Sequence, residues 1–179
     1  MIRLRNGAIV LAAIVCSVLT CAQDKSRRPS PPGSAECKFA DGKTVHIDYS
    51  RPSVKGRKIF GGLVPYDKEW RTGANEATTF IASTNLEVGG AKVPAGNYTL
   101  FTMPSPKQWT LIISKKTGEW GIPYPGKSED LARIPMRSEE LSSSVEQFTI
   151  SFERTAPEAC TLRMDWETTR AEVSVREQK

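Results

Sequence analysis

The side chains best suited to chemistry are concentrated in one stretch of the sequence, Arg51–Thr79. It carries several cations, and guanidinium groups donate paired hydrogen bonds to carboxylate, phosphate or sulfate, so these cations can form an anion site. Trp70, together with Trp120 further along, offers flat apolar faces for a sugar or another ring. Asn75 supplies both a donor and an acceptor, and Glu76 can orient a neighbouring arginine or act as a base. The candidate ligand-binding residues are Arg51, Lys55, Arg57, Trp70, Arg71, Asn75 and Glu76.

These residue types permit functions of different classes. The one we favour is non-enzymatic binding of a small anionic or sugar-like ligand. The first alternative is a hydrolase in which Glu76 works with Asp48 or His46, because two carboxylates about 5–9 Å apart can hydrolyse a glycoside. The sequence does not contain that distance, and the identity of the ligand is equally open.

The second alternative is a structural or envelope-interaction protein whose motif only stabilises the fold. Here Arg51 and Arg71 pair with Glu76 to pin the loop, and Trp70 is its hydrophobic plug. Networks of ion pairs imitate functional sites, so this interpretation competes directly with binding.

The residue inventory argues against several other classes of protein. There is one histidine, His46, so we expect no metal site built on two or three histidines, and we expect no cofactor. Sequence motifs for a nucleophile elbow, a phosphate loop or a dinucleotide site are absent from the chain. The formal net charge of +5 comes mostly from the first 36 residues. We therefore expect no nucleic-acid partner, and the oligomeric state is left open.

Two runs of sequence, Tyr49–Arg57 and Trp70–Thr78, resemble the bacterial exported family catalogued as domain of unknown function 2911. The resemblance implies an exported, β-rich domain and supplies no activity. Asp67 stands where the family pattern leads us to expect glycine, and the polar tail after Val175 is a second departure. Further matches to the pattern are Pro94–Leu100, Trp109, Trp120-Gly121 and Trp166-Glu167, so the resemblance covers nearly all of Cys37–Val175.

The beginning of the chain has the pattern of a secretory signal, which we assign to residues 1–22. A short basic stretch precedes the apolar run Ala8–Cys16, and small residues follow. That run is shorter than the roughly 20 residues that cross a bilayer, so we expect cleavage rather than a transmembrane span. We favour ordinary cleavage after Ala22 over lipid anchoring at Cys21, because Thr20 stands where a lipobox usually has Gly or Ala. The predicted location is periplasmic or secreted.

Residues 23–36 are rich in proline, serine and charge, so we expect a linker there. Residues 37–179 then form a single domain, which is long enough for one well-buried core. Only two cysteines lie beyond the leader, Cys37 and Cys160. In an oxidising compartment this pair predicts a disulfide.

Apolar and polar residues alternate with a period of two along most of the domain, and turn residues separate the runs. This pattern predicts an all-β domain, an antiparallel β-sandwich that is jelly-roll-like or barrel-like, with one long motif-bearing loop. Short helical turns are expected at Ser128–Leu131 and Ser138–Ser142. The expected strands are Thr44–Tyr49, Ala77–Ser83, Leu86–Val88, Lys92-Val93, Tyr98–Met103, Gln108–Ile113, Phe148–Phe152, Cys160–Trp166 and Ala171–Val175.

Overall fold

The computed structural model describes residues 28–179 of the chain. The expected signal peptide, both of its candidate processing sites and the first part of the expected linker lie outside the described residues. Within residues 28–179, no helix is long and apolar enough to cross a membrane.

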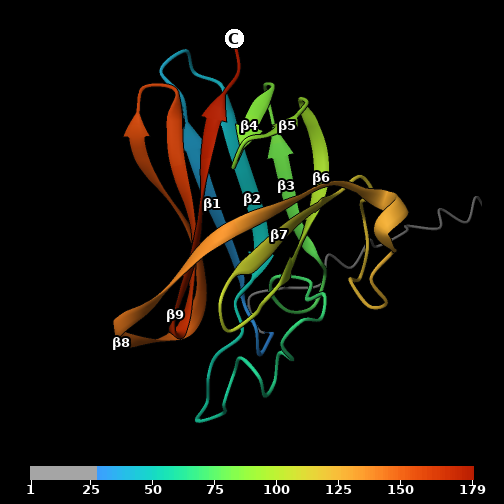
Figure 1. Cartoon of the computed structure of the whole chain (residues 1–179), viewed down its shortest axis with the longest axis vertical. Coiled ribbons are helices and arrows are strands. Elements are labelled where there is room, and N and C mark those ends of the chain that lie inside the picture. Colours follow the sequence, from blue (N-terminus) through green and yellow to red (C-terminus); the bar gives the residue numbers. More distant parts are fainter. Residues whose placement is uncertain (1–27) are drawn as a thin grey trace, which may run out of the picture.

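The described chain folds into strands joined by loops, with a single 3-10 turn at Lys127–Glu129 (Figure 1). Neighbouring strands are antiparallel throughout, in the order β1-β2-β3-β6-β7-β8-β9-β4-β5. The predicted all-β class is therefore confirmed. The strands are β1 (Pro32–Lys38), β2 (Thr44–Ser50), β3 (Thr78–Ala82), β4 (Leu86–Val88), β5 (Ala91–Val93), β6 (Gly96–Met103), β7 (Trp109–Ser114), β8 (Asp130–Ala156) and β9 (Ala159–Glu177).

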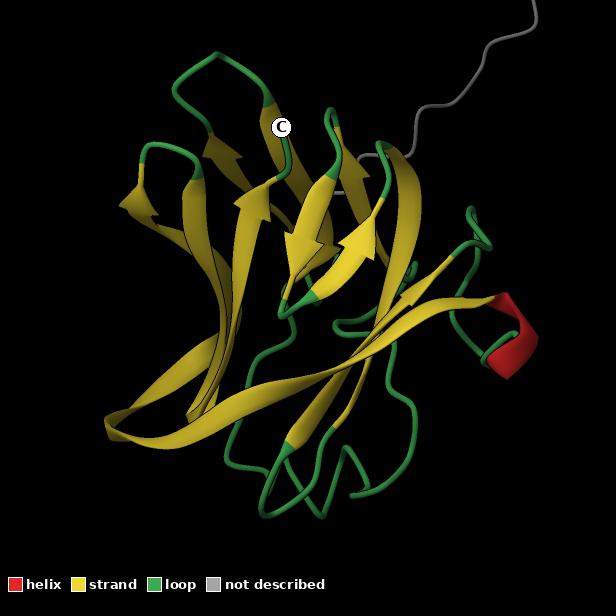
Figure 2. Ribbon diagram, turned by 45° about the horizontal axis from the view of Figure 1, so that its top comes forward, coloured by secondary structure: helices red, strands yellow, loops and turns green. Residues whose placement is uncertain are grey.

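Strand β8 is long enough to belong to both halves of the sandwich. Its first part pairs with β7, with Met136 opposite Trp109, and its second part pairs with β9, with Arg137 opposite Glu172. Figure 2 shows this ribbon running from the 3-10 turn across the molecule and then bending into the part that pairs with β9. One continuous strand therefore carries the chain from the β1-β2-β3-β6-β7 half to the β9-β4-β5 half.

The core is built by the alternation seen in the sequence. In β2, Val45 and Ile47 are completely buried, whereas Asp48 between Ile47 and Tyr49 is exposed. In β9, Leu162 and Trp166 are buried in the same way. Side chains of successive strand residues point to opposite faces, so each strand contributes one apolar face to a common interior.

A disulfide joins Cys37 in β1 to Cys160 in β9, across 123 residues of sequence. The predicted pairing is therefore present in the structure. The bond connects the first strand of the domain to the last, at opposite ends of the described chain. Both half-cystines are buried with the apolar core.

Several local expectations differ from the structure. The strands expected at Cys160–Trp166 and Ala171–Val175 form one strand, β9, and the strand expected at Phe148–Phe152 is part of the longer β8. Of the turn expected at Ser128–Leu131, residues 128–129 lie in the 3-10 turn, and β8 begins at Asp130.

Ser138–Ser142, expected as a helical turn, lies within β8, where Ser138 pairs with Ala171 of β9. This prediction was wrong because cross-strand pairing overrides the weak local preference of a serine-rich segment. Strand β1 begins at Pro32, inside the expected linker, and pairs with the end of β2. Proline is tolerated there because it is the first residue of an edge strand.

The motif-bearing loop between β2 and β3 is ordered by isolated bridges rather than by a ladder. Trp70 pairs with Thr102 of β6, and Ser53 pairs with Gln147 of β8. Asp67 has a backbone φ of 57°, in the left-handed region that favours glycine. This explains why the family pattern led us to expect glycine at that position.

Candidate functional site

Arg51 braces the start of the motif loop against β8. Its Nε donates to the Phe148 carbonyl at 3.3 Å, and its Nη2 donates to Thr149 Oγ1 at 3.1 Å. The aliphatic part of the Arg51 side chain packs against Gly33. A Cβ atom at position 33 would lie only 2.6 Å from Arg51 Cδ, so glycine leaves room for the arginine. The structure thus gives this predicted ligand residue a bracing position between β1 and β8.

Asn75 and Glu76 hold the segment that precedes β1. Asn75 Nδ2 donates to the Ser30 carbonyl at 3.0 Å and to Ser50 Oγ at 3.1 Å. Arg28 Nη1 donates to both carboxylate oxygens of Glu76, at 2.8 and 2.7 Å. Neither Arg51 nor Arg71 hydrogen-bonds to Glu76, so the expected arrangement of that network is not the one observed.

Lys55 and Arg57 lie at the outer end of the loop. The Lys55 side chain is exposed, and its backbone N–H donates to Glu146 Oε1 at 2.9 Å. Arg57 folds back on its own turn, donating from Nε to the Val54 carbonyl at 3.0 Å and from Nη2 to the Ser53 carbonyl at 2.5 Å. Lys55 therefore links the loop to β8 through its backbone N–H, and the Arg57 side chain is held in place by two carbonyl oxygens.

Trp70 is part of an aromatic cluster at the base of the loop. Its ring stacks on Trp166, with centroids 5.7 Å apart and planes 19° from parallel, and meets Phe148 edge-on at 5.1 Å. Its Nε1 donates to the Gly73 carbonyl at 3.0 Å. The position of Trp70 in this cluster fits the hydrophobic plug considered from the sequence.

A cavity of about 330 Å³ opens between the motif loop and the loop that carries Gly121-Ile122. We call it the motif cavity. It brings together three of the predicted ligand residues, and Arg51, Lys55, Asn75 and Glu76 do not line it. Its walls include Arg57, Leu63, Trp70, Arg71, Ile122 and Trp166.

Arg71 is the cation of this cavity with the fewest partners. Its Nη1 donates to the Trp120 carbonyl at 3.4 Å, and no ion pair to a carboxylate forms within residues 28–179. Burial lowers the pKa of Arg71, because removal of water disfavours the charged form. A Cβ on Gly121 would lie 2.7 Å from Arg71 Cβ, so glycine allows the second loop to pack on the arginine stem.

The motif cavity also contains residues that the sequence analysis missed. Leu63 and Ile122 are large apolar side chains that are 48% and 69% exposed. The sequence gives no sign of this exposure, so only the structure identifies them as candidate binding residues. Glu69 lines the cavity but pairs with Arg133 at 3.1 Å. Trp120, expected to offer a flat face, is 57% exposed and does not line the cavity.

Trp166 adds an unusual polar feature to this wall. The side chain is 1% exposed, and its buried Nε1–H has no acceptor in the part of the chain that the structure describes. Buried indole N–H groups usually find a partner, because an unmade hydrogen bond is costly. The cavity therefore offers one guanidinium without a carboxylate partner among residues 28–179, whereas the Trp166 N–H is itself buried.

The residues of the hydrolase alternative lie elsewhere. Glu76 and Asp48 both line a different cavity, of about 380 Å³, beside β2. His46 Nε2 lies 3.1 Å from Asp48 Oδ1, and His46 Nδ1 lies 3.6 Å from Glu36 Oε2. Each of these carboxylates already has a basic neighbour. Among residues 28–179, no group of three or more His, Cys, Asp or Glu side chains is arranged to hold a metal ion.

The chain is an antiparallel β-sandwich domain with a cavity of about 330 Å³ beneath one long loop. The family model described as protein of unknown function (DUF2911) matches residues 30–175, and the chain belongs to this family. The match begins two residues before β1 and ends two residues before the end of β9, so it covers nearly the whole sandwich. No curated protein and no solved structure matches the chain.

Proposed function

We propose that this protein is a non-enzymatic binding domain for a small organic anion with an apolar body, held in the motif cavity. The observation that carries the proposal is Arg71, a partly buried guanidinium without a carboxylate partner in residues 28–179. Removing a cation from water without pairing it costs free energy. A ligand carboxylate that accepts a forked pair of hydrogen bonds from Arg71 offsets that cost.

The remaining walls favour a ligand that is partly apolar. Leu63 and Ile122 are exposed, and Trp70 lies with them on the same cavity. An apolar ligand body covers these side chains, and burial of apolar surface contributes about 25 cal/mol per Å². The volume of about 330 Å³ is near the lower end of the roughly 300–1,000 Å³ usual for ligand sites, which favours a small molecule.

The ionisable groups of the cavity support recognition rather than proton transfer. They are Arg57, Arg71 and Glu69, and Glu69 is held by Arg133. Arginine stays protonated at neutral pH and donates in a fixed plane, which suits binding of carboxylate or phosphate.

The test is binding of benzoate, with benzamide as its uncharged counterpart and acetate as its counterpart without the ring. Isothermal titration of the purified protein should show benzoate binding more tightly than either. Arg71→Gln should weaken benzoate affinity by about tenfold, the effect of losing one charged hydrogen bond of about 1.5 kcal/mol.

Lys92→Gln is the matched control, because it removes the same charge from an exposed position in β5. It should leave benzoate affinity unchanged. Equal affinity for benzoate and benzamide, or equal loss in both variants, would remove the basis for an anion site at Arg71.

A further inference from the structure

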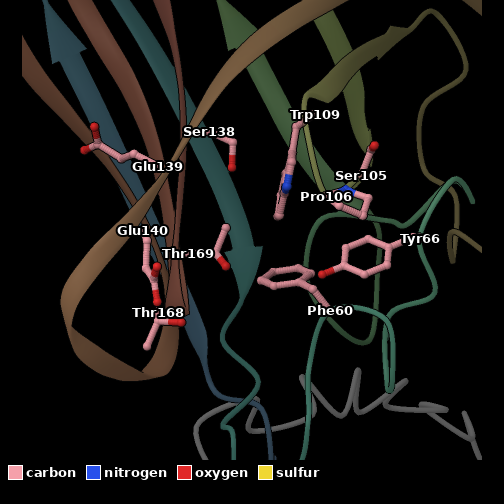
Figure 3. A pocket seen from close by; sticks show the side chains of 10 residues that line it. All are labelled: Phe60, Tyr66, Ser105, Pro106, Trp109, Ser138, Glu139, Glu140, Thr168 and Thr169. Carbon is pink, nitrogen blue, oxygen red and sulfur yellow. The ribbon is translucent and has the colours of Figure 1, made fainter.

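A second cavity, outside the motif cavity, lies between the aromatic side of the core and the bent strands β8 and β9. It has a volume of about 230 Å³, and we call it the β8–β9 cavity. Figure 3 shows Phe60, Tyr66 and Trp109 on one side of it, and residues of β8 and β9 on the other. The two sides differ in chemistry, since one is aromatic and the other carries hydroxyl and carboxylate groups.

The aromatic wall is held rigidly by the core. Phe60 meets Trp109 edge-on with centroids 4.7 Å apart, and it meets Trp166 edge-on at 6.0 Å. Phe60 and Trp109 are 5% and 2% exposed, whereas Tyr66 is only partly buried. Tyr66 therefore presents most of the accessible aromatic surface. Rings fixed in this way lose little conformational freedom when a ligand binds.

The polar wall is shaped by an irregularity in the β8–β9 ladder. Glu140 pairs with Thr169, and the register shifts between Glu140 and Val145. A bulge of this kind bends the strand and re-aims side chains, which is why bulges are common beside functional sites. Here Ser138, Glu140 and Thr169 come to line the same cavity.

Four polar groups of the cavity are not used by the fold. The Trp109 indole N–H and the hydroxyls of Tyr66, Ser138 and Thr169 make no hydrogen bond with any residue of the described chain. In Figure 3 the Tyr66 oxygen lies toward the polar wall, and the Trp109 nitrogen borders the open space. The cavity thus presents donors and acceptors together, since each hydroxyl can serve as either.

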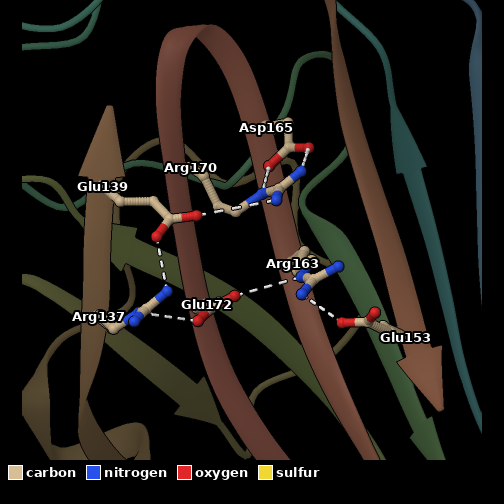
Figure 4. Close-up of polar contacts among 7 residues, drawn as sticks. All are labelled: Arg137, Glu139, Glu153, Arg163, Asp165, Arg170 and Glu172. Carbon is tan, nitrogen blue, oxygen red and sulfur yellow. Dashed lines mark hydrogen bonds and ion pairs between the residues drawn. The ribbon is translucent and has the colours of Figure 1, made fainter. Parts of the chain in front are cut away.

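The two glutamates of the wall play different parts. Glu139 pairs with Arg137 at 2.6 Å and with Arg170 at 3.8 Å, in the cross-strand ion-pair network of Figure 4. Its carboxylate points away from the cavity in Figure 3, whereas Glu140 makes no ion pair within residues 28–179. One carboxylate acceptor is therefore available at the cavity.

We propose that the β8–β9 cavity binds a single neutral sugar ring. The C–H face of a pyranose lies against Tyr66 and Phe60, and its hydroxyls exchange hydrogen bonds with Ser138, Thr169 and Glu140. The presence of Glu140 and the lack of a lining cation disfavour an anion at this place. The volume, below the roughly 300 Å³ at which larger ligand sites begin, favours one ring over a chain.

A cationic ligand is the strongest competitor, because aromatic rings and a carboxylate also attract ammonium groups. Two features favour the sugar. Glu139 already forms ion pairs with two arginines, and the Trp109 N–H is a donor that a cation cannot satisfy. A sugar hydroxyl accepts from this N–H while it donates to Glu140.

The experiment is saturation-transfer NMR on the purified protein with methyl glucosides, methyl galactosides and N-acetylglucosamine. At least one of these sugars should bind, with signal transferred chiefly to protons of one ring face. Tyr66→Phe and Thr169→Val each remove one hydroxyl and keep nearly the same shape. Each should weaken affinity about fivefold, the equivalent of one neutral hydrogen bond.

The controls separate this site from the motif cavity. Arg71→Gln should leave sugar binding unchanged, and benzoate should not displace the sugar, so failure at one cavity says nothing against the other. Melting curves of Tyr66→Phe and Thr169→Val establish that both variants are folded. The proposal is overturned if no sugar binds at about 50 mM, far above the roughly 1 mM of a weak site. Binding that survives both substitutions, or binding of tetramethylammonium in place of sugars, also overturns it.

Discussion

Arg28 donates hydrogen bonds of 2.8 and 2.7 Å to the two carboxylate oxygens of Glu76. Arg28 lies in the segment that precedes β1, 48 residues before Glu76 in the sequence. Asn75, beside Glu76, bonds to the Ser30 carbonyl in the same segment. The end of the motif loop therefore holds residues 28–30 in place through these hydrogen bonds. Glu76 therefore serves the architecture, whereas the cations Arg57 and Arg71 line the motif cavity.

Because Glu76 pairs with Arg28 and not with Arg71, the structure predicts which of these residues are energetically coupled. In a double-mutant cycle, Arg28→Ala and Glu76→Ala should show a coupling of about 0.5–1 kcal/mol, a modest value because the pair is partly exposed. Arg71→Ala and Glu76→Ala should add to within about 0.5 kcal/mol, since no hydrogen bond joins them. Urea unfolding of the single and double variants measures both values. A larger coupling for Arg71 than for Arg28 would contradict the observed pairing.

The disulfide should be a large contributor to stability. Protein expressed from Gln23 onward should show no free thiol when unfolded without reductant, because its two cysteines are Cys37 and Cys160. Closing a loop across 123 residues restricts the unfolded chain. Replacement of both cysteines by alanine should therefore lower the free energy of unfolding by about 4 kcal/mol. Two reactive thiols in the unreduced protein would refute the bond.

Tyr124 should make stability fall at high pH. Burial, together with its hydrogen bond to Asp130, raises the pKa of Tyr124 to about 12 from the ordinary value of 10.0. Between these two values the unfolded chain has lost the phenolic proton and the folded chain keeps it. The folded state binds more protons in that window, so its advantage shrinks as pH rises.

The measurement is urea unfolding of the natural protein and of Tyr124→Phe across this pH range. The stability difference between them should be constant below about pH 10 and should then fall toward pH 12. A difference that stays level through the window would show that Tyr124 titrates alike in both states.

Asp67 has a positive backbone φ, and its cost in stability can be measured. Its φ of 57° costs a side chain with a branched Cβ about 1–2 kcal/mol, whereas glycine adopts it freely. Asp67→Val should therefore lower stability by about 1 kcal/mol or more, and Asp67→Gly should leave it unchanged or slightly raised. The neighbouring exposed residue Lys68 is the control, because Lys68→Val tests the same side chain without the positive φ. Equal losses at both positions would show that side-chain chemistry, not φ, decides.

The sequence alone determined the features that follow from local pattern. Alternation along β2 and β9 identified their buried faces, because a strand turns successive side chains to opposite sides. The disulfide followed from there being only two cysteines beyond the leader. From the sequence, Asp67 stood out only as a residue where the family pattern led us to expect glycine, and its positive φ became known from the structure.

The tertiary structure alone decided how charges are paired and where space is left. Ser138–Ser142 became strand because β9 offered a partner, and Glu76 paired with Arg28 because the chain entering β1 passes over the motif loop. Leu63 and Ile122, 59 residues apart in sequence, came to share one cavity. A cavity is the space between segments remote in sequence, and an arginine pairs with whichever carboxylate folding brings within reach. Local periodicity encodes neither of these, which is why some of the seven motif residues brace the fold and others line the motif cavity.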